Sequence, residues 1–201
     1  MKKLACLSFC LLIGSANAAI IDFEDVAVAS GTNSDSGDLT SGGFSFDLLA
    51  DHSHLANNNA SGNSGSTFLI VDNYSGPNAL NLSATSGATF SLSSIDLGEV
   101  NPVKGLATEV SLIGNLLGGG ILNATITLDG IVSSGGSNNF ETFALGWTNL
   151  TDVTFTATAG SGDHYWAIDN INTASVPEPA TLALIGLGLA GIRLSKKTKN
   201  T

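Results

Sequence analysis

Cysteine is almost absent from this chain of 201 residues. The two cysteines, Cys6 and Cys10, both lie in an apolar N-terminal stretch that we expect to be removed. The rest of the chain therefore forms no disulfide bonds and performs no thiol catalysis. A lipoprotein is excluded as well, because a small residue has to precede a lipid-modified cysteine and Phe9 precedes Cys10.

The N-terminal stretch, residues 1–18, has the pattern of a secretory signal peptide. Lys2 and Lys3 precede an apolar run from Leu4 to Ile13, which is too short to span a membrane. Ala16 and Ala18 then form an A-x-A cleavage site. We therefore predict export through the Sec pathway and cleavage after Ala18 by signal peptidase. The alternative, a buried N-terminal helix, is weaker because the run has no polar periodicity.

Basic residues are missing from the middle of the chain. Between Ala19 and Ser175 the sole base is Lys104, against sixteen acids, so this region carries a formal charge of −15. A nucleic-acid-binding face needs clustered Lys and Arg, which excludes nucleic acid as a partner. The charge is consistent with solubility through self-repulsion, or with the binding of a cation such as Ca²⁺.

Long helical periodicity and strand–helix–strand patterns are also lacking. Instead, short segments alternate apolar and polar residues at period two, as half-buried strands do. The clearest are 67–71, 89–95, 124–128 and 153–157, with further candidates at 20–26, 43–49, 79–83, 108–113, 140–145 and 165–171. About ten such segments separated by Gly, Ser and Asn clusters predict an all-β, antiparallel β-sandwich over residues 19–175. A β-helix is the alternative, but it requires a fixed repeat that we do not find.

The C-terminal tail, residues 176–201, carries the most specific motif. Val176-Pro177-Glu178-Pro179 precedes an apolar segment, residues 180–194, which we expect to form a short transmembrane helix, and a basic end, residues 193–201. The prolines fix an extended segment that an enzyme can grip, and the basic end is expected to stay on the cytoplasmic side of a membrane.

This order of features resembles the PEP-CTERM sorting domain; an ordinary C-terminal anchor is the alternative. The resemblance implies processing near the Pro-Glu-Pro motif by an exosortase, a membrane protease-transferase. The family is associated with bacteria that make exopolysaccharide and biofilm. The resemblance therefore implies that the protein is anchored transiently in the inner membrane and ends at the cell surface or in the extracellular matrix.

The region between the two processing segments shows little sign of catalysis. It has no G-x-S-x-G nucleophile motif. His52 and His54 would share a face of a strand and could hold one transition metal, with Asp51 or His164 as a third ligand. We favour the simpler interpretation of a polar, exposed loop, because two histidines without a wider motif rarely suffice.

The two ends of this region resemble carbohydrate-binding and galactose-binding-like jelly rolls. Glu24 and Asp25 follow Phe23 near the start, and Asp169 and Asn170 follow Ile168 near the end. The resemblance implies that the first and last strands pair and that these four residues hold a structural Ca²⁺ through oxygen ligands. The alternative is that they are polar edge residues beside buried Phe23 and Ile168.

Three functions remain open from the sequence. The first is a non-enzymatic structural or interaction role at the cell surface, which we favour. The second is a Ca²⁺-dependent carbohydrate-binding module, for which the available aromatic residues are Tyr74, Trp147, Tyr165 and Trp166. The third is a hydrolase with a carboxylate pair, although any pair is uninformative among so many acids.

Overall fold

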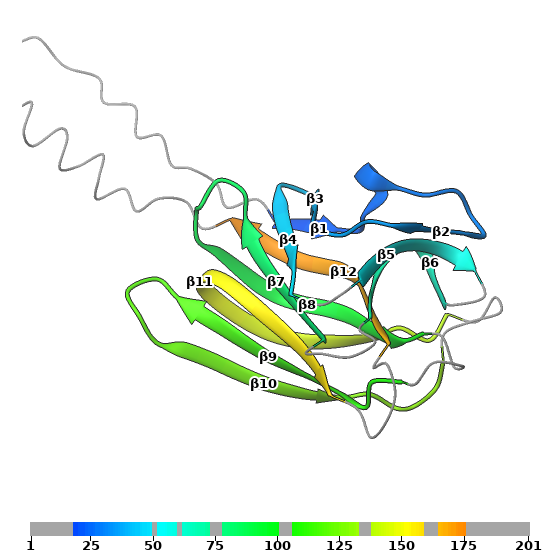
Figure 1. Ribbon diagram of the computed structural model, residues 1–201. Helices are drawn as coiled ribbons and strands as arrows, with labels where there is room; N and C mark the ends of the chain where they lie inside the picture. Colours follow the sequence, from blue (N-terminus) through cyan, green and yellow to red (C-terminus); the bar gives the residue numbers. More distant parts are fainter. Residues whose placement is uncertain are drawn as a thin grey trace, which may run out of the picture. The chain divides into compact units, whose positions relative to one another are not determined.

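Twelve strands and one short 3-10 helix make up the described part of the computed structural model, residues 18–49, 52–59, 62–72, 78–100, 106–132, 138–158 and 165–175 (Figure 1). The elements are β1 (Ala18–Ile21), η1 (Glu24–Val26), β2 (Thr32–Asp35), β3 (Leu39–Ser41), β4 (Phe44–Leu48), β5 (His52–Asn59), β6 (Gly62–Asp72), β7 (Asn78–Ala84), β8 (Phe90–Glu99), β9 (Glu109–Leu116), β10 (Ile121–Thr127), β11 (Glu141–Thr158) and β12 (Trp166–Ser175). All pairs between these strands are antiparallel, which confirms the predicted fold class.

The strands form one curled sheet whose two halves we call the first and second layers (Figure 1). The first layer has the order β2-β5-β6-β12-β8, and the second has the order β10-β9-β11-β7-β4-β3. The long strand β11 belongs to both, because residues 141–150 pair with β8 and residues 150–158 pair with β7 and β9.

A bend in β11 allows this change of layer. Its pairing with β8 shifts register on either side of Trp147, and Gly146 and Asn149 both have left-handed backbone conformations. Such bulges turn a strand and increase its twist, and Gly and Asn adopt these angles at low cost.

The main core lies between the two layers. Alternate residues point inward from both, as the period-two pattern predicts. Phe90 of β8 meets Phe44 of β4 with ring centroids 5.1 Å apart, and Phe155 of β11 meets Trp166 of β12 at 6.1 Å. Burying each such side chain contributes about 1.5–3 kcal/mol to folding, so these contacts hold the layers together.

A smaller apolar cluster covers the other face of β5, β6 and β12. It comprises Ala56, Phe68, Ile70, Val100, Tyr165 and Ala167, with Phe140 packed against it. β6 is consequently buried on both faces, which explains its continuous apolar run from Phe68 to Val71. Gly98 of β8 is required here, because a Cβ at this position would lie 2.9 Å from the Phe140 ring.

The first and last strands pair, as expected from the jelly-roll resemblance. Ala18 lies opposite Ala174, and Ile21 lies opposite Ile171. The described chain therefore begins and ends at the same end of the domain.

Candidate functional site

Glu24 and Asp25 lie in the 3-10 turn η1, which corrects the expected strand over residues 20–26. β1 ends at Ile21 because Phe23 adopts a left-handed conformation, with φ of 57°. The buried ring of Phe23 packs against that of Phe46, with the ring centroids 5.1 Å apart. The chain leaves the sheet at this point, and both carboxylates are exposed.

Glu24 closes a gap between strands. β6 pairs with β12 only as far as Leu69, and β1 takes its place beside β12 from Ile171 onward. At this change of partner, Oε1 of Glu24 accepts a hydrogen bond from the backbone N–H of Thr67 at 2.7 Å. The carboxylate thus satisfies a donor of β6 beyond the last residue that pairs with β12.

Asp25 is used elsewhere. Its two carboxylate oxygens accept hydrogen bonds from Oγ of Ser41 at 2.5 Å and from the backbone N–H of Gly42 at 2.9 Å. These donors hold the pKa of Asp25 below its usual range. Asp25 therefore fastens η1 to the turn between β3 and β4.

Asp169 is a fully buried carboxyl group on β12. Burial is the main effect and raises its pKa to about 6. Hydrogen bonds from the hydroxyl groups of Ser66 and Ser64 and from the backbone N–H of Asn170 lower the pKa and partly offset this rise. The nearby charge of Asp96, directly opposite on β8, raises the pKa further.

Asn170 sits in a bulge of β12 with φ of 45°. Its Nδ2 donates to Oδ2 of Asp96 at 3.0 Å, and Oγ1 of Thr142 donates to the other oxygen of Asp96 at 2.6 Å. Glu24 and Asp169 bond to adjacent residues of β6, Thr67 and Ser66, while Asn170 bonds to Asp96. Sequence reasoning missed Asp96, since its part depends on the β8–β12 register.

Among the described residues, no three His, Cys, Asp or Glu side chains lie close enough together in this structure to hold a metal ion. The Ca²⁺ site at Glu24, Asp25, Asp169 and Asn170 therefore stays a prediction.

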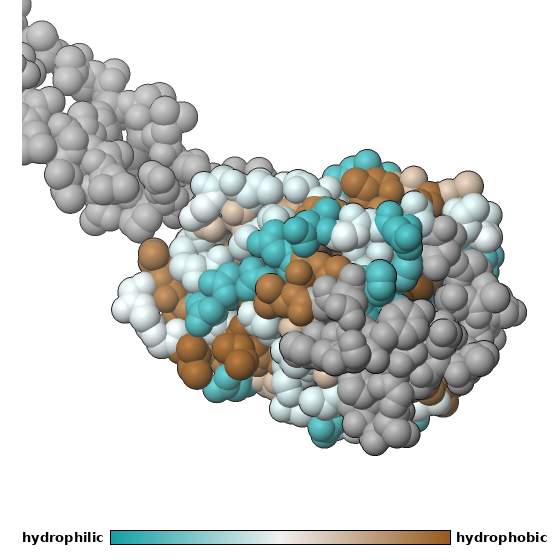
Figure 2. All heavy atoms as spheres, in the orientation of Figure 1, coloured by the Kyte–Doolittle hydropathy of each residue, from teal (hydrophilic) through white to brown (hydrophobic). Residues whose placement is uncertain are grey.

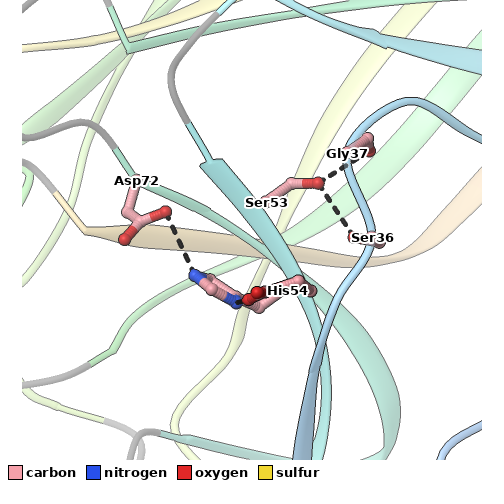
Figure 3. Close-up of polar contacts among 6 residues, drawn as sticks. Ser36, Gly37, Ser53, His54 and Asp72 are labelled. Atoms are coloured by element: carbon pink, nitrogen blue, oxygen red, sulfur yellow. Dashed lines mark hydrogen bonds and ion pairs between the residues drawn. The ribbon is translucent and has the colours of Figure 1, made fainter.

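His54 lies between two carboxylates on the first layer, and Figure 3 shows its contact with Asp72. Its Nδ1 is 2.7 Å from Oδ1 of Asp35 on β2, and its Nε2 is 3.5 Å from Oδ1 of Asp72 on β6. The pKa of His54 is raised mainly by its interaction with the carboxylate of Asp72.

The prediction of an exposed loop around His52 and His54 was wrong, because His52 to Asn59 form β5. Asp72 gave no sequence signal, since only the β5–β6 register places it opposite His52.

The neighbouring Ser53 serves a different purpose. Its hydroxyl group donates to the carbonyl of Gly37 at 2.8 Å and lies 2.9 Å from the hydroxyl group of Ser36 (Figure 3). Ser53 thus ties β5 to the segment after β2, and His54 contacts the end of β2 itself through Asp35.

Another buried carboxyl group, that of Glu99, lies at the end of β8. Its Oε1 accepts a hydrogen bond from the backbone N–H of Gly130 at 2.5 Å, and its Oε2 has no hydrogen bond to any described residue. Burial, together with the charges of Asp129 and Glu141, raises the pKa of Glu99.

The outer face of the second layer is polar. The residues that share it across β7, β11, β9 and β10 include Asn81, Ser83, Asp152, Thr154, Thr156, Ser111, Asn115, Asn123 and Thr125. Oδ1 of Asp152 accepts hydrogen bonds from Nδ2 of Asn115 at 2.7 Å and from Nδ2 of Asn81 at 3.4 Å. Figure 2 shows a band of hydrophilic residues crossing the visible face, with hydrophobic residues beside it.

Two of the four aromatic residues available for sugar stacking are buried. Trp166 is fully buried in the main core, and Tyr165 is buried in the smaller cluster on the opposite face. This confirms that neighbouring residues of a strand point to opposite faces. Trp147 is half-buried over Gly114, and Tyr74 lies outside the described residues.

The processing residues also lie mainly outside the described part. Of the signal-peptide residues, Ala18 is described and Ala16 is not; the motif Val176, Pro177, Glu178, Pro179 and the apolar segment 180–194 are not described. Among the helices of the described ranges, none is long and apolar enough to cross a membrane.

Comparison with protein families confirms the sorting motif. The PEP-CTERM protein-sorting motif matches residues 175–197, starting at the last residue of β12. The motif indicates an exported protein that is held by its C-terminal tail before exosortase processing. A comparison with curated proteins finds no match.

Several solved structures resemble the chain at low identity. A family 29 carbohydrate-binding module from Piromyces equi has a TM-score of 0.46 at 11% identity, covering 85% of this chain and 99% of the module. Another family 29 module has a TM-score of 0.45 at 16% identity, covering 80% and 90%. An exo-β-agarase has a TM-score of 0.42 at 13% identity, covering 79% of this chain and 25% of the agarase. The fold assignment rests on the strands and their antiparallel pairing.

Proposed function

We propose that the protein is a non-enzymatic component of the cell surface or extracellular matrix, released from its membrane anchor by an exosortase. The observation that carries the proposal is the sorting motif at residues 175–197. A role in exopolysaccharide or biofilm follows from the association of this motif family, and the strongly acidic domain suits a hydrated matrix.

The folded domain is compatible with both processing events. Cleavage after Ala18 would remove a single residue of β1 and one pairing, that of Ala18 with Ala174. The motif Val176–Pro179 begins after β12 ends at Ser175, so cleavage there leaves every strand intact. A domain that keeps its sheet after both cuts can fold before its tail is processed.

Intact-mass spectrometry of surface-extracted protein tests this proposal. In a host with an exosortase we expect a mature chain that starts at Ala19 and lacks the segment after the Pro-Glu-Pro region. A variant with Pro177→Ala, Glu178→Ala and Pro179→Ala should retain Thr201 and stay with the membrane. Recovery of the wild-type protein with its tail complete through Thr201 would refute the proposal.

Carbohydrate binding is the second candidate, and the polar outer face of the second layer favours it. Amide and hydroxyl groups in register across four strands offer both donors and acceptors to the hydroxyl groups of a polysaccharide. In the described residues the exposed large apolar side chains are all aliphatic, as in Ile113 and Ile121, so binding would depend on hydrogen bonds more than on stacking.

A glycan array with and without Ca²⁺ tests this candidate. The double variant Thr154→Val and Thr156→Val removes two hydroxyl groups of the face with little change in volume, and should weaken binding. Thr148→Val, on the same strand before it enters the second layer, is the matched control and should bind as the wild type does. Equal binding by all three proteins would exclude this face.

A further inference from the structure

We propose that His52, His54 and Asp72 form a binding site for Zn²⁺ or a similar divalent transition-metal ion on the β5–β6 pair. This inference is independent of the proposed function. It depends on strand register, on one distance and on the burial of one carboxylate.

Strand register places the three side chains together. His52 lies directly opposite Asp72, and His54 follows two residues later on β5. Residues opposite each other, and residues two apart along a strand, share one face of a sheet. The set therefore combines two imidazoles and one carboxylate, which are ligands that Zn²⁺ uses.

The distance between His54 and Asp72 fits two ligands of one ion. Nε2 of His54 and Oδ1 of Asp72 are 3.5 Å apart, which is long for a hydrogen bond. Zinc bonds of about 2.0–2.2 Å at a tetrahedral angle separate two ligand atoms by about 3.4 Å. The pair is thus spaced as the edge of a tetrahedral site.

Asp72 requires a cation. Its side chain is 0% exposed, and the contact that its carboxylate makes is the 3.5 Å approach of Oδ1 to Nε2 of His54, while Oδ2 has no hydrogen bond to a described residue. An ionised carboxylate in such a place is costly unless it is paired. Arg is absent between Ala19 and Ser175, and Lys occurs there once, at Lys104. The positive charge that balances Asp72 therefore comes either from a protonated His54 imidazole or from a metal ion bound between His54 and Asp72.

Asp35 lies at ion-pair distance from the other ring nitrogen of His54. Metal-binding histidines commonly donate their second ring N–H to a carboxylate, which fixes the tautomer and the ring. Nδ1 of His54 lies 2.7 Å from Oδ1 of Asp35, so Nε2 is the nitrogen that faces Asp72. Two ligands and their supporting carboxylate are therefore in place before a metal ion arrives.

His52 would complete the site by a side-chain rotation. Its exposed ring stacks on that of His54 with centroids 6.2 Å apart and an interplanar angle of 18°. In this position the three side chains do not yet close around an ion, in keeping with the absence of a complete metal cluster in the described ranges. A change of the His52 rotamer would bring a third ligand to the His54–Asp72 pair.

Calorimetric titration of the untagged, chelator-treated full-length protein with ZnCl₂ tests the proposal, with Co²⁺ absorption spectra reporting on coordination. We expect one site with a tetrahedral Co²⁺ spectrum. The variants His52→Gln, His54→Gln and Asp72→Asn should each lose at least tenfold in affinity, and Asp35→Asn should lose about 10–100-fold as a supporting residue does. Asp47→Asn on β4 is the control and should bind as the wild type does.

Circular dichroism melting curves establish that each variant is folded. His52 is exposed and Asp72→Asn removes a buried charge, so these two variants keep the test interpretable if His54→Gln does not fold. Absence of Zn²⁺ binding, or unchanged affinity in either His52→Gln or Asp72→Asn, would overturn the proposal. It would leave the His54–Asp72 contact as a proton-mediated ion pair.

Discussion

Asp169 on β12 accepts a hydrogen bond from the Oγ of Ser66 on β6 at 2.7 Å, although the strands no longer pair at this point. The contact joins two strands beyond the end of their ladder. It also leaves a buried carboxyl group whose charge is opposed by its surroundings, with consequences for pH dependence.

The raised pKa of Asp169, about 6, predicts a domain that loses stability as the pH rises. The ordinary value is 3.8, so between about pH 4 and pH 6 the folded state binds more protons than the unfolded state, and the free energy of unfolding falls with pH. A shift of this size corresponds to about 3 kcal/mol. Urea unfolding of wild type and Asp169→Asn at pH 4.5 and 7.5 measures it. We expect the variant to gain stability relative to wild type at pH 7.5, and an equal pH dependence in both proteins would contradict the assignment.

Glu99 should act in the same direction, because burial raises its pKa too. Glu99→Gln keeps an acceptor for the N–H of Gly130 and removes the charge. The variant is therefore expected to melt at a higher temperature than wild type above neutral pH, with the gain shrinking in acid. Glu109→Gln, an exposed site on β9, provides the control and should change the melting temperature little. A lower melting temperature for Glu99→Gln at pH 7.5 would show that its charge is stabilising.

The sequence predicted the strands of the two layers better than the edges of the sheet. Segments 89–95, 124–128 and 153–157 fall in β8, β10 and β11 to within one residue, because alternation reflects one buried and one exposed face. By contrast, Thr32–Asp35 and His52–Asn59 consist mostly of polar residues and look like loops, yet form β2 and β5. These strands are held by backbone hydrogen bonds to the adjacent strands, and such bonds cannot be predicted from the residue types of the segment.

The candidate sites show the same limit. The identities of His52, His54, Asp169 and Asn170 were visible in the sequence, whereas their partners Asp72 and Asp96 were not. These pairs depend on which strands are neighbours and in what register. The turn at η1 was also hidden, because the left-handed conformation of Phe23 follows from the packing of its ring.

Calcium is predicted to stabilise the domain if Glu24, Asp25, Asp169 and Asn170 supply its ligands. A ligand that binds only the folded state adds about 2.7 kcal/mol at a hundredfold excess over Kd, so millimolar Ca²⁺ should raise Tm by several degrees. Mg²⁺ should do less, because it demands stricter octahedral geometry. Asp169→Ala should lose most of the effect and Asp129→Ala should keep it. A shift no larger than that of NaCl at equal ionic strength would reflect screening alone.

Gly98→Ala should destabilise the smaller apolar cluster. The added methyl group would meet the Phe140 ring, which packs on Phe68 at 5.3 Å. Overpacking of this kind costs about 1–3 kcal/mol, and chemical denaturation would measure the loss. Phe140→Leu in the same chain should recover part of it, because the smaller side chain makes room. If the double variant loses the sum of the two single changes, the residues do not interact as the structure places them.

The position of the tail has a mechanical consequence. The sorting motif follows β12, which pairs with β8 on one side and with β6 and then β1 on the other. Tension applied through the tail would run along the axis of this interior strand. Its backbone hydrogen bonds are perpendicular to the pulling direction, so they would be loaded in shear and would have to break together. An edge strand such as β3 is held by hydrogen bonds to one neighbour only. While tethered, the domain is therefore held by a strand that is supported on both sides against drag.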